Sequence, residues 1–416
     1  MFSSINIGAI ALKNYGVASR SHTVFMDLLF EQFQEVFNGK PEIISSAPGR
    51  VNLIGEHTDY NEGFVFPVAI NTRTTCAIRP AKFATRLISL QAGKAEIFDS
   101  KKPRIVKFWG KYAVGCAKAI AQFSGKPTPN IEGLISSEIP KGSGLSSSAA
   151  LCVSLINAWN GLFDYGFTPE QISDIAFTAE NKYVGIACGR MDQMAASQGK
   201  KGYALLIDTR SSKLDYYPLP ESLEIVILDT RKPRALTNSR YNKRVEECQT
   251  AVRLIQKIKP EISSLRDVDF QLLEESKKVI TNKVIYRRAR HVVSENQRTL
   301  DFAHALERND FEALGELCMQ SHLSLKEDYE VSCRELDVMA ESAWNSTGCV
   351  AARMTGAGFG GSCVALVERG SIDTFINEVM EQYLRKDFRM PVVKQVSSDD
   401  GGKAEKLLMA EFREQK

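Results

Sequence analysis

The sequence has few residues of the kinds that build metal sites or disulfide frameworks. Only five histidines occur among 416 residues, and no two of them have the spacing of metal ligands. The nine cysteines are scattered along the chain, odd in number and never arranged as C-x-x-C. This pattern excludes a zinc ribbon, a redox pair and a secreted disulfide scaffold.

Long apolar runs are missing as well. No stretch approaches the roughly 20 residues that a membrane-spanning helix needs. Residues 1–20 have neither the charged start nor the apolar segment of a signal peptide. We therefore expect a cytoplasmic protein with no membrane partner.

Charge of one sign is not in excess either. The chain carries 53 basic and 50 acidic residues, a formal net charge of +3, and no basic block stands out. Nucleic acid is therefore not an expected partner. The 44% hydrophobic and 25% charged residues are ordinary for a globular protein, and the length suggests two domains.

Strand-like and helix-like segments are segregated along the chain, which predicts an α+β fold. Apolar residues at helical spacing predict a helix over 169–183, and a last helix is expected over 403–414. After a strand-rich first half, long amphipathic helices dominate. The change falls near 208–220, so we expect one domain over residues 1–208 and a second over residues 209–416.

A segment rich in glycine and serine precedes a strongly helical stretch. Its members are Gly142, Ser143, Gly144, Leu145, Ser146, Ser147 and Ser148. Glycines let the backbone approach a ligand, and the free amides at a helix start attract anions such as phosphates. A tight turn with a serine-capped helix explains the pattern about equally well. No P-loop motif occurs.

A second segment, residues 50–61, concentrates charge between glycines. Glu56 and Asp59 could accept hydrogen bonds from sugar hydroxyls, and His57 could donate or accept one. Charge density by itself favours a solvated loop. The apolar residues within the segment instead indicate partial burial, where charges need partners, and a polyhydroxyl ligand is one. A metal site at His57 is weakly supported because no third ligand is obvious.

Two further segments say less by themselves. Glu180 and Asp192 lie at either end of a predicted helix and loop, and together they could hold Mg²⁺ and face a nucleophile. Surface carboxylates are the plainer interpretation. Residues 356–361 contain four glycines just before a predicted strand, which indicates backbone packed against a ligand or a structural turn.

Taken in their order along the chain, the four segments resemble those of the GHMP kinases. Residues 144–150 (GLSSSAA) and 353–361 resemble the second and third motifs of that superfamily. Residues 49–61 (GRVNLIGEHTDYN) resemble the signature of the galactokinases almost letter for letter, and residues 234–248 resemble their tyrosine-containing sugar segment. The resemblance spans roughly residues 46–367, most of the chain.

The resemblance implies an N-terminal domain like the second domain of ribosomal protein S5 and a ferredoxin-like C-terminal domain, with the active site between them. It implies an enzyme that transfers the γ-phosphate of ATP to the C1 hydroxyl of galactose. It implies that Asp192 is the catalytic carboxylate and that Arg50 stabilises the charge of the transition state. The residues implied to bind the sugar are Glu56, His57, Thr58, Asp59, Gly189 and Tyr241. The loop from Gly142 to Ser148 would bind ATP, and Ser148 and Glu180 would bind Mg²⁺. Trp109 resembles an aromatic residue near the adenine.

Some positions depart from the family pattern, and alternatives stay open. Arg190 stands beside the proposed base, where many relatives have an apolar residue. Within the tyrosine segment, Arg240 replaces a common glutamate and Val245 replaces an arginine. These changes could adjust substrate choice, and an extra cation near the site could suit an acidic sugar. Related kinases for N-acetylgalactosamine, L-arabinose or galacturonate are therefore alternatives. Another alternative is a regulatory sensor that binds galactose and ATP without catalysis. Such sensors lack part of the serine-alanine pair of the second motif, whereas here Ser148 and Ala149 form the complete pair. A monomer is favoured, although the sequence does not give the oligomeric state.

Overall fold

The computed structural model describes residues 22–104, 106, 108–140, 142–233 and 237–407. The helices are α2 (His22–Phe37), α3 (Gly110–Ser124), α4 (Ser147–Phe163), α5 (Pro169–Thr178), α6 (Met191–Gln198), α7 (Thr237–Ile255), α8 (Phe270–Glu275), α9 (Lys283–Glu307), α10 (Phe311–Glu327), α11 (Arg334–Trp344) and α12 (Ile372–Leu384). The strands are β1 (Ile43–Asn52), β2 (Phe64–Val65), β3 (Pro67–Pro80), β4 (Thr85–Ser89), β5 (Lys94–Phe98), β6 (Ile131–Ser137), β7 (Tyr203–Asp208), β8 (Lys213–Pro218), β9 (Leu223–Asp229), β10 (Cys349–Thr355), β11 (Ser362–Glu368), β12 (Val392–Val396) and β13 (Lys403–Lys406).

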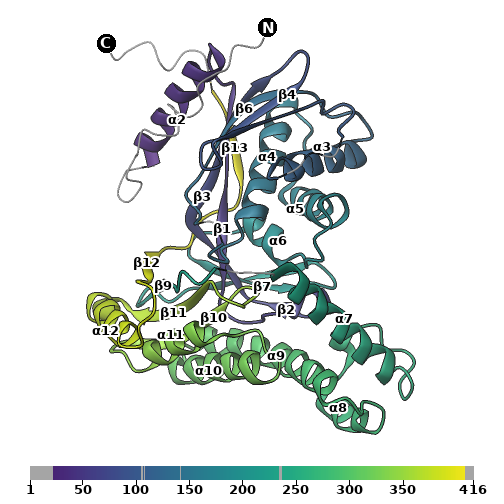
Figure 1. Ribbon diagram of the computed structural model, residues 1–416, viewed down its shortest axis with the longest axis vertical. Helices are drawn as coiled ribbons and strands as arrows, with labels where there is room; N and C mark the ends of the chain where they lie inside the picture. The colour runs from purple at the N-terminus through teal and green to yellow at the C-terminus, as the bar shows by residue number, and fades with distance from the viewer. Residues whose placement is uncertain (1–21, 105, 107, 141, 234–236, 408–416) are drawn as a thin grey trace.

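A six-stranded sheet organises the upper part of the molecule in Figure 1, in the order β13-β1-β3-β6-β4-β5. Helix α2 packs on one face through Leu29 and Phe33. Helices α4 and α6 pack on the other face, and α3 and α5 pack against α4, which buries Trp159. Since both faces are covered, the long central strands β1 and β3 are buried along nearly their whole length.

The lower part combines a four-stranded antiparallel sheet, β10-β11-β9-β12, with helices α7 to α12 (Figure 1). A small sheet, β2-β7-β8, lies between the two parts. Helix α10 packs on β10, and α9 packs on both α7 and α10. Sheets and helices are thus segregated, which confirms the predicted α+β class.

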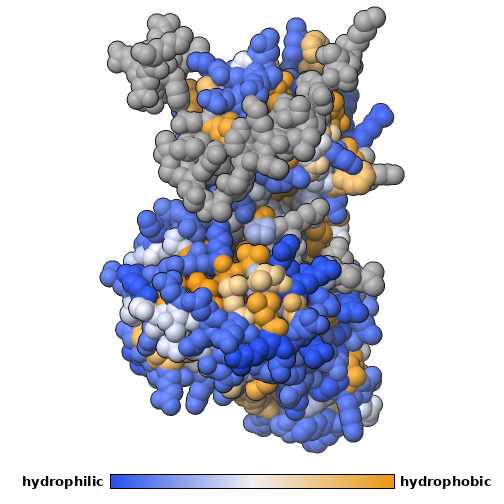
Figure 2. All heavy atoms as spheres, turned by 60° about the vertical axis from the view of Figure 1, so that its left-hand side comes forward, coloured by the Kyte–Doolittle hydropathy of each residue, from blue (hydrophilic) through white to orange (hydrophobic). Residues whose placement is uncertain are grey.

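Figure 2 shows a mostly hydrophilic face of the molecule with an apolar patch near its centre. Among the described residues, none of the helices is long and apolar enough to span a membrane.

Two predicted helices differ from the structure. The helix expected over 169–183 begins as predicted, with Thr168 closing a capping box, but it ends at Thr178 and continues as a π-helix, Ala179–Val184. The helix expected over 403–414 is wrong where the chain is described, because Lys403–Lys406 forms β13 and pairs with β1. The edge of β1 offers unpaired backbone groups that a short final segment can satisfy. Residues 408–416 lie outside the described residues.

The last strand therefore joins the first sheet, although it lies far along the chain from β1. The division into residues 1–208 and 209–416 stays a prediction.

Candidate active site

A cavity of about 280 Å³ opens where the glycine-serine segment, the charged segment 50–61 and the start of α6 meet. Its lining comes from all four segments that the sequence singled out and from the start of α7. Of the predicted site residues, the lining includes Arg50, Glu56, His57, Asp59, Gly142, Gly144, Leu145, Ser146, Ser147, Ser148, Gly189, Asp192 and Tyr241. The predicted residues Thr58, Ser143 and Glu180 lie outside the lining.

A buried arginine joins the two sides of the cavity. Arg50, at the end of β1, donates through Nε and Nη2 to Oδ1 of Asp192, at 2.8 and 2.6 Å. Its Nη1 donates to the carbonyl oxygen of Gly144 at 2.6 Å. Both Arg50 contacts to the carboxylate fall on Oδ1, and the Asp192 side chain is 29% exposed. The arrangement fixes a carboxylate and a guanidinium directly beside the glycine-serine loop.

The loop reaches Arg50 because a glycine precedes it. A Cβ on Gly49 would lie 2.7 Å from the carbonyl oxygen of Leu145, closer than side chains tolerate. The same carbonyl accepts the Arg50 amide at 3.2 Å. The register of β1 against β3 shifts between Pro48 and Gly49, so the regular strand pairing is interrupted directly before Arg50.

The glycine-serine loop has the backbone of an anion site. Gly142, Gly144 and Ser146 have φ angles of 80°, 86° and 59°, and α4 begins at the next residue. Successive amides in such turns and at a helix start point outward, toward a negative ligand. The Ser146 hydroxyl is buried and has no protein partner. Ser143 instead supports the loop, since its hydroxyl donates to Pro140 O at 2.8 Å.

A buried carboxylate lies behind this loop. Glu180 is 3% exposed on the π-helix, where its side chain accepts from Gln193 Nε2 at 2.5 Å and also bonds to the Ser148 hydroxyl. Burial raises the pKa of Glu180 to about 7, and the bonds to Ser148 and Gln193 oppose that rise. Within the described part of the chain, no cluster of three metal-ligating side chains occurs. One carboxylate and one hydroxyl suit Mg²⁺, which takes few protein ligands and completes its shell with phosphates and water.

Glu56 links the charged segment to the late glycines. Its Oε1 accepts from the Gly356 amide at 2.7 Å and from the Thr355 hydroxyl at 3.2 Å, and Arg353 Nη1 lies 3.5 Å away. The Thr58 hydroxyl points away from the cavity, 2.6 Å from the carbonyl oxygen of Phe64. These two residues therefore hold the loop in shape.

The Asp59 carboxylate lines the cavity in the charged segment. Burial raises its pKa to about 7, and the nearby Asp192 and Glu56 carboxylates add to the rise. A Cβ on Gly189 would lie 2.1 Å from Asp59 Oδ2, so glycine is needed where the two chain segments touch. Tyr241, from α7, closes the wall, with its ring centroid 5.5 Å from that of His57.

The structure also uses a stripe of polar residues on α9 that the sequence analysis missed. Glu295 is fully buried, and its Oε1 accepts from the Gly55 amide at 3.0 Å and the Glu56 amide at 3.3 Å. His291 Nε2 contacts the carbonyl oxygen of Glu56 at 3.0 Å. These residues, with Thr299, recur every four positions on the buried face of an amphipathic helix. This four-residue spacing could have identified them from the sequence, because polar side chains on the buried face of a helix need hydrogen-bond partners.

The residues that depart from the family pattern, Arg190, Arg240 and Val245, are not among those that line the cavity. The Arg190 guanidinium pairs with Asp174 and lies 4.5 Å from the ring centroid of Phe177. Arg240 lies over Phe359, 5.4 Å from its ring centroid. This pairing occupies the Arg190 guanidinium with a carboxylate of α5, and the hypothesis that Arg190 provides a cation for an acidic sugar stays a hypothesis.

Three family models match parts of the chain. The model described as the galactokinase galactose-binding signature matches residues 31–80. The models for the N-terminal and C-terminal domains of GHMP kinases match residues 111–200 and 302–386.

Whole-length relatives carry the same description. A galactokinase from Roseiflexus sp. is 40% identical over 90% of this chain and 95% of its own length. A galactokinase from Clostridium beijerinckii is 38% identical over 90% and 98%. The crystal structure of Lactococcus lactis galactokinase complexed with galactose is similar, with a TM-score of 0.87, 34% identity, and coverage of 92% of this chain and all of that one. Methanococcus jannaschii mevalonate kinase, at 17% identity and a TM-score of 0.61, shares the fold.

Proposed function

The chain belongs to the galactokinase family of the GHMP kinases, and on that premise we propose that it transfers the γ-phosphate of ATP to the C1 hydroxyl of galactose. Its fold is the α+β fold of that superfamily, with an S5-like part and a ferredoxin-like part. We further propose that the first part spans residues 1–208 and that the second part spans residues 209–416. Strand β13 of the second range then pairs with β1 in the first sheet.

One observation carries the proposal most strongly, the bridge that Arg50 makes between Asp192 and the carbonyl oxygen of Gly144. It supports the proposal because a carboxylate, which can take a proton, and a cation, which can neutralise charge, lie beside the glycine-serine loop that we assign to the phosphates. Phosphoryl transfer requires mainly such positioning and charge stabilisation. A sugar hydroxyl held at Asp192 would therefore face the terminal phosphate of a nucleotide in the loop.

In the proposed reaction, the C1 oxygen of galactose forms a bond to the γ-phosphorus while the bond from that phosphorus to the β-phosphate bridging oxygen breaks. The hydroxyl proton passes to Oδ2 of Asp192, because Arg50 occupies Oδ1. Arg50 stabilises the negative charge on the transferring group. The products are galactose 1-phosphate and ADP.

The phosphate side of the site is assigned to the loop from Gly142 to Ser148 and the start of α4. Ser148 and Glu180 would hold Mg²⁺, and the buried Glu180 carboxylate with its adjacent hydroxyl fits that ion. When bound with ATP, Mg²⁺ neutralises phosphate charge and orients the nucleotide. Gln193 keeps Glu180 turned toward Ser148.

The sugar side is assigned to Asp59, His57, Gly189 and Tyr241. Asp59 would accept hydrogen bonds from sugar hydroxyls, and Gly189 lets the chain pass against its carboxylate. The rings of His57 and Tyr241 form a wall of the cavity. Glu56 and Thr58 would act through the shape of the loop.

We also propose a cytoplasmic monomer that works on ATP and galactose. The nine cysteines are free thiols, which suits a reducing compartment.

The test is ADP release with Mg·ATP and a panel of galactose, N-acetylgalactosamine, L-arabinose, glucose and galacturonate. We expect turnover with galactose. Turnover with another sugar in its place would overturn the assignment of substrate. The Asp192→Asn variant keeps the shape of the site but cannot take the proton, so we expect turnover to vanish while calorimetry still detects galactose and ATP. Turnover of that variant near the parent rate would refute the role of Asp192.

A further inference from the structure

A chain of hydrogen bonds runs from the cavity wall into the lower part of the molecule, behind the residues assigned to the sugar. It begins at His57, which is 4% exposed and has a left-handed backbone with φ of 64°. His57 Nδ1 lies 2.8 Å from the Tyr60 hydroxyl, which lies 2.7 Å from the Tyr329 hydroxyl. The Tyr329 hydroxyl lies 3.1 Å from Cys248 Sγ. The chain thus joins the charged segment to α7 and to the turn after α10.

The contact of the second imidazole nitrogen, Nε2, fixes which group donates in each of these hydrogen bonds. His57 Nε2 lies 3.3 Å from the carbonyl oxygen of Ala357, which can only accept, so Nε2 must carry a hydrogen. Burial, then the nearby His291, lowers the pKa of His57 to about 3, so the ring is neutral and Nδ1 has no hydrogen. Nδ1 must therefore accept from Tyr60.

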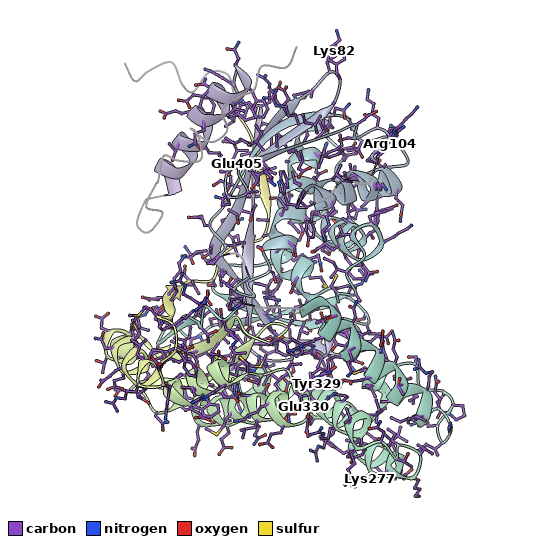
Figure 3. All side chains as sticks on the ribbon, viewed as in Figure 1. Lys82, Arg104, Lys277, Tyr329, Glu330 and Glu405 are labelled. Atoms are coloured by element: carbon purple, nitrogen blue, oxygen red, sulfur yellow. The ribbon has the colours of Figure 1, made fainter. Side chains whose placement is uncertain are left out.

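Each hydroxyl has a single hydrogen, which fixes the rest of the chain. Because Tyr60 donates to His57, it must accept from Tyr329. Because Tyr329 donates to Tyr60, it must accept from the Cys248 thiol. Tyr329 and Cys248 are buried, at 0% and 1% exposure, so these bonds do not compete with bulk water. Figure 3 shows Tyr329 within the lower part of the molecule, next to Glu330.

The same rings also pack. The Tyr60 ring meets Tyr241 edge to face, with centroids 5.2 Å apart, and the His57 ring lies 4.8 Å from that of Tyr329. Neither Tyr60 nor Tyr329 lines the cavity, whereas His57 and Tyr241 do. The two tyrosines therefore support the wall from behind.

We propose that Tyr60 and Tyr329 are positioning residues of the sugar site, which hold His57 as its Nε2–H tautomer and commit both ring nitrogens to protein partners. His57 then serves the sugar as a rigid wall and does not use its ring nitrogens to bind sugar hydroxyls. This inference rests on the proposed function for its ligand. The tautomer itself is a property of the chain without substrate.

The test combines a spectroscopic and a kinetic measurement. Protein labelled with ¹⁵N-histidine contains five imidazoles, and we expect the His57 signals to show a protonated Nε2 and an unprotonated, hydrogen-bonded Nδ1. In Tyr60→Phe the Nδ1 signal should shift as it loses its donor, and KM for galactose should rise roughly tenfold, the cost of one unsatisfied buried acceptor. KM for ATP should stay unchanged.

Two other variants complete the series. Tyr329→Phe leaves the bond from Tyr60 to His57 in place, so we expect a rise in galactose KM of about threefold, smaller than that of Tyr60→Phe. Tyr286→Phe is the matched control, since its hydroxyl donates to Glu274 at 2.8 Å on the outside of α9, and it should change neither measurement.

A protonated Nδ1 in the parent protein would overturn the proposal. So would a Tyr60→Phe variant with an unchanged Nδ1 signal and an unchanged galactose KM. If Tyr60→Phe does not fold, the graded effect of Tyr329→Phe on the same signal and on KM decides the matter. If the predicted tautomer is found but galactose does not bind, the proposed function fails while the hydrogen-bond chain stands.

Discussion

The pKa of Asp59 makes galactose affinity depend on pH in a way that can be worked out in advance. Burial, with the Asp192 carboxylate adding to it, raises that pKa to about 7 from an ordinary value of 3.8. Galactose has no charge of its own in this range. Any change in its affinity between pH 6 and pH 8 must therefore come from the protein.

The ionised carboxylate is the stronger acceptor of sugar hydroxyls, because charge-assisted hydrogen bonds are about twice as strong as neutral ones. With a pKa near 7, about one Asp59 in eleven is ionised at pH 6 and about ten in eleven at pH 8. We therefore expect the Kd for galactose to fall roughly tenfold over these two pH units, if only the ionised form binds well. Isothermal titration calorimetry without nucleotide measures it directly.

The controls separate Asp59 from its neighbours. Asp59→Asn should weaken binding and give a flat pH profile, because the amide does not titrate. Glu180→Gln should keep the slope, although the pKa of Glu180 is also about 7. His57 is not the source, since its pKa is lowered to about 3. A Kd for the parent protein that stays constant within twofold from pH 6 to 8, or a slope that survives in Asp59→Asn, would refute this reasoning.

Three further changes test other parts of the molecule. Arg50→Ala should lower kcat/KM by an amount that corresponds to a loss of about 3–4 kcal/mol in transition-state stabilisation, as the loss of a donor to transition-state charge does. Steady-state kinetics in which only KM changes would contradict this prediction. Glu295→Gln removes the charge of a fully buried carboxylate that pairs with Arg298 at 2.9 Å and lies 3.9 Å from the buried Arg353 guanidinium. Chemical denaturation should therefore show a loss of about 3–5 kcal/mol in the free energy of unfolding, and a loss under about 1 kcal/mol would argue against a buried ion pair. Burial by itself would raise the pKa of Glu295, but the neighbouring guanidiniums have the larger effect and lower this pKa to about 2. The stability that the Glu295 carboxylate contributes is therefore fully present above its ordinary pKa of 4.5 and is lost as the pH falls toward 2. Arg190→Ala should leave sugar selectivity unchanged in the ADP-release panel, whereas a new preference among the sugars would place this side chain back at the site.

Much of the site could be predicted from sequence because its chemistry is local. The loop from Gly142 to Ser148 needs glycines for its left-handed turns and serines at the helix start, and both needs are visible in the letters. The segment around Glu56 to Asp59 likewise carries its carboxylates and its histidine within four positions.

Other predictions failed where distant parts of the chain compete for the same groups. The segment 403–406 has a helix-compatible composition, yet it forms β13 because the edge of β1 supplies backbone partners that the isolated segment lacks. Arg190 lies two positions from Asp192 in sequence, and the sequence did not indicate that its guanidinium pairs with Asp174 of α5. Ionic partners are chosen by distance in space, which sequence spacing does not encode.

The sequence by itself therefore determined the α+β class and the family resemblance of this protein, and it marked out the segments that line the cavity, because loop conformation and residue chemistry are properties of short stretches. Only the tertiary structure decided which of those residues face the cavity and which support it. Glu295 reaches the amides of Gly55 and Glu56 from 240 and 239 positions away, and Tyr329 reaches Tyr60 from 269. Buried polar groups must find partners wherever the fold brings them, and packing alone settles where that is.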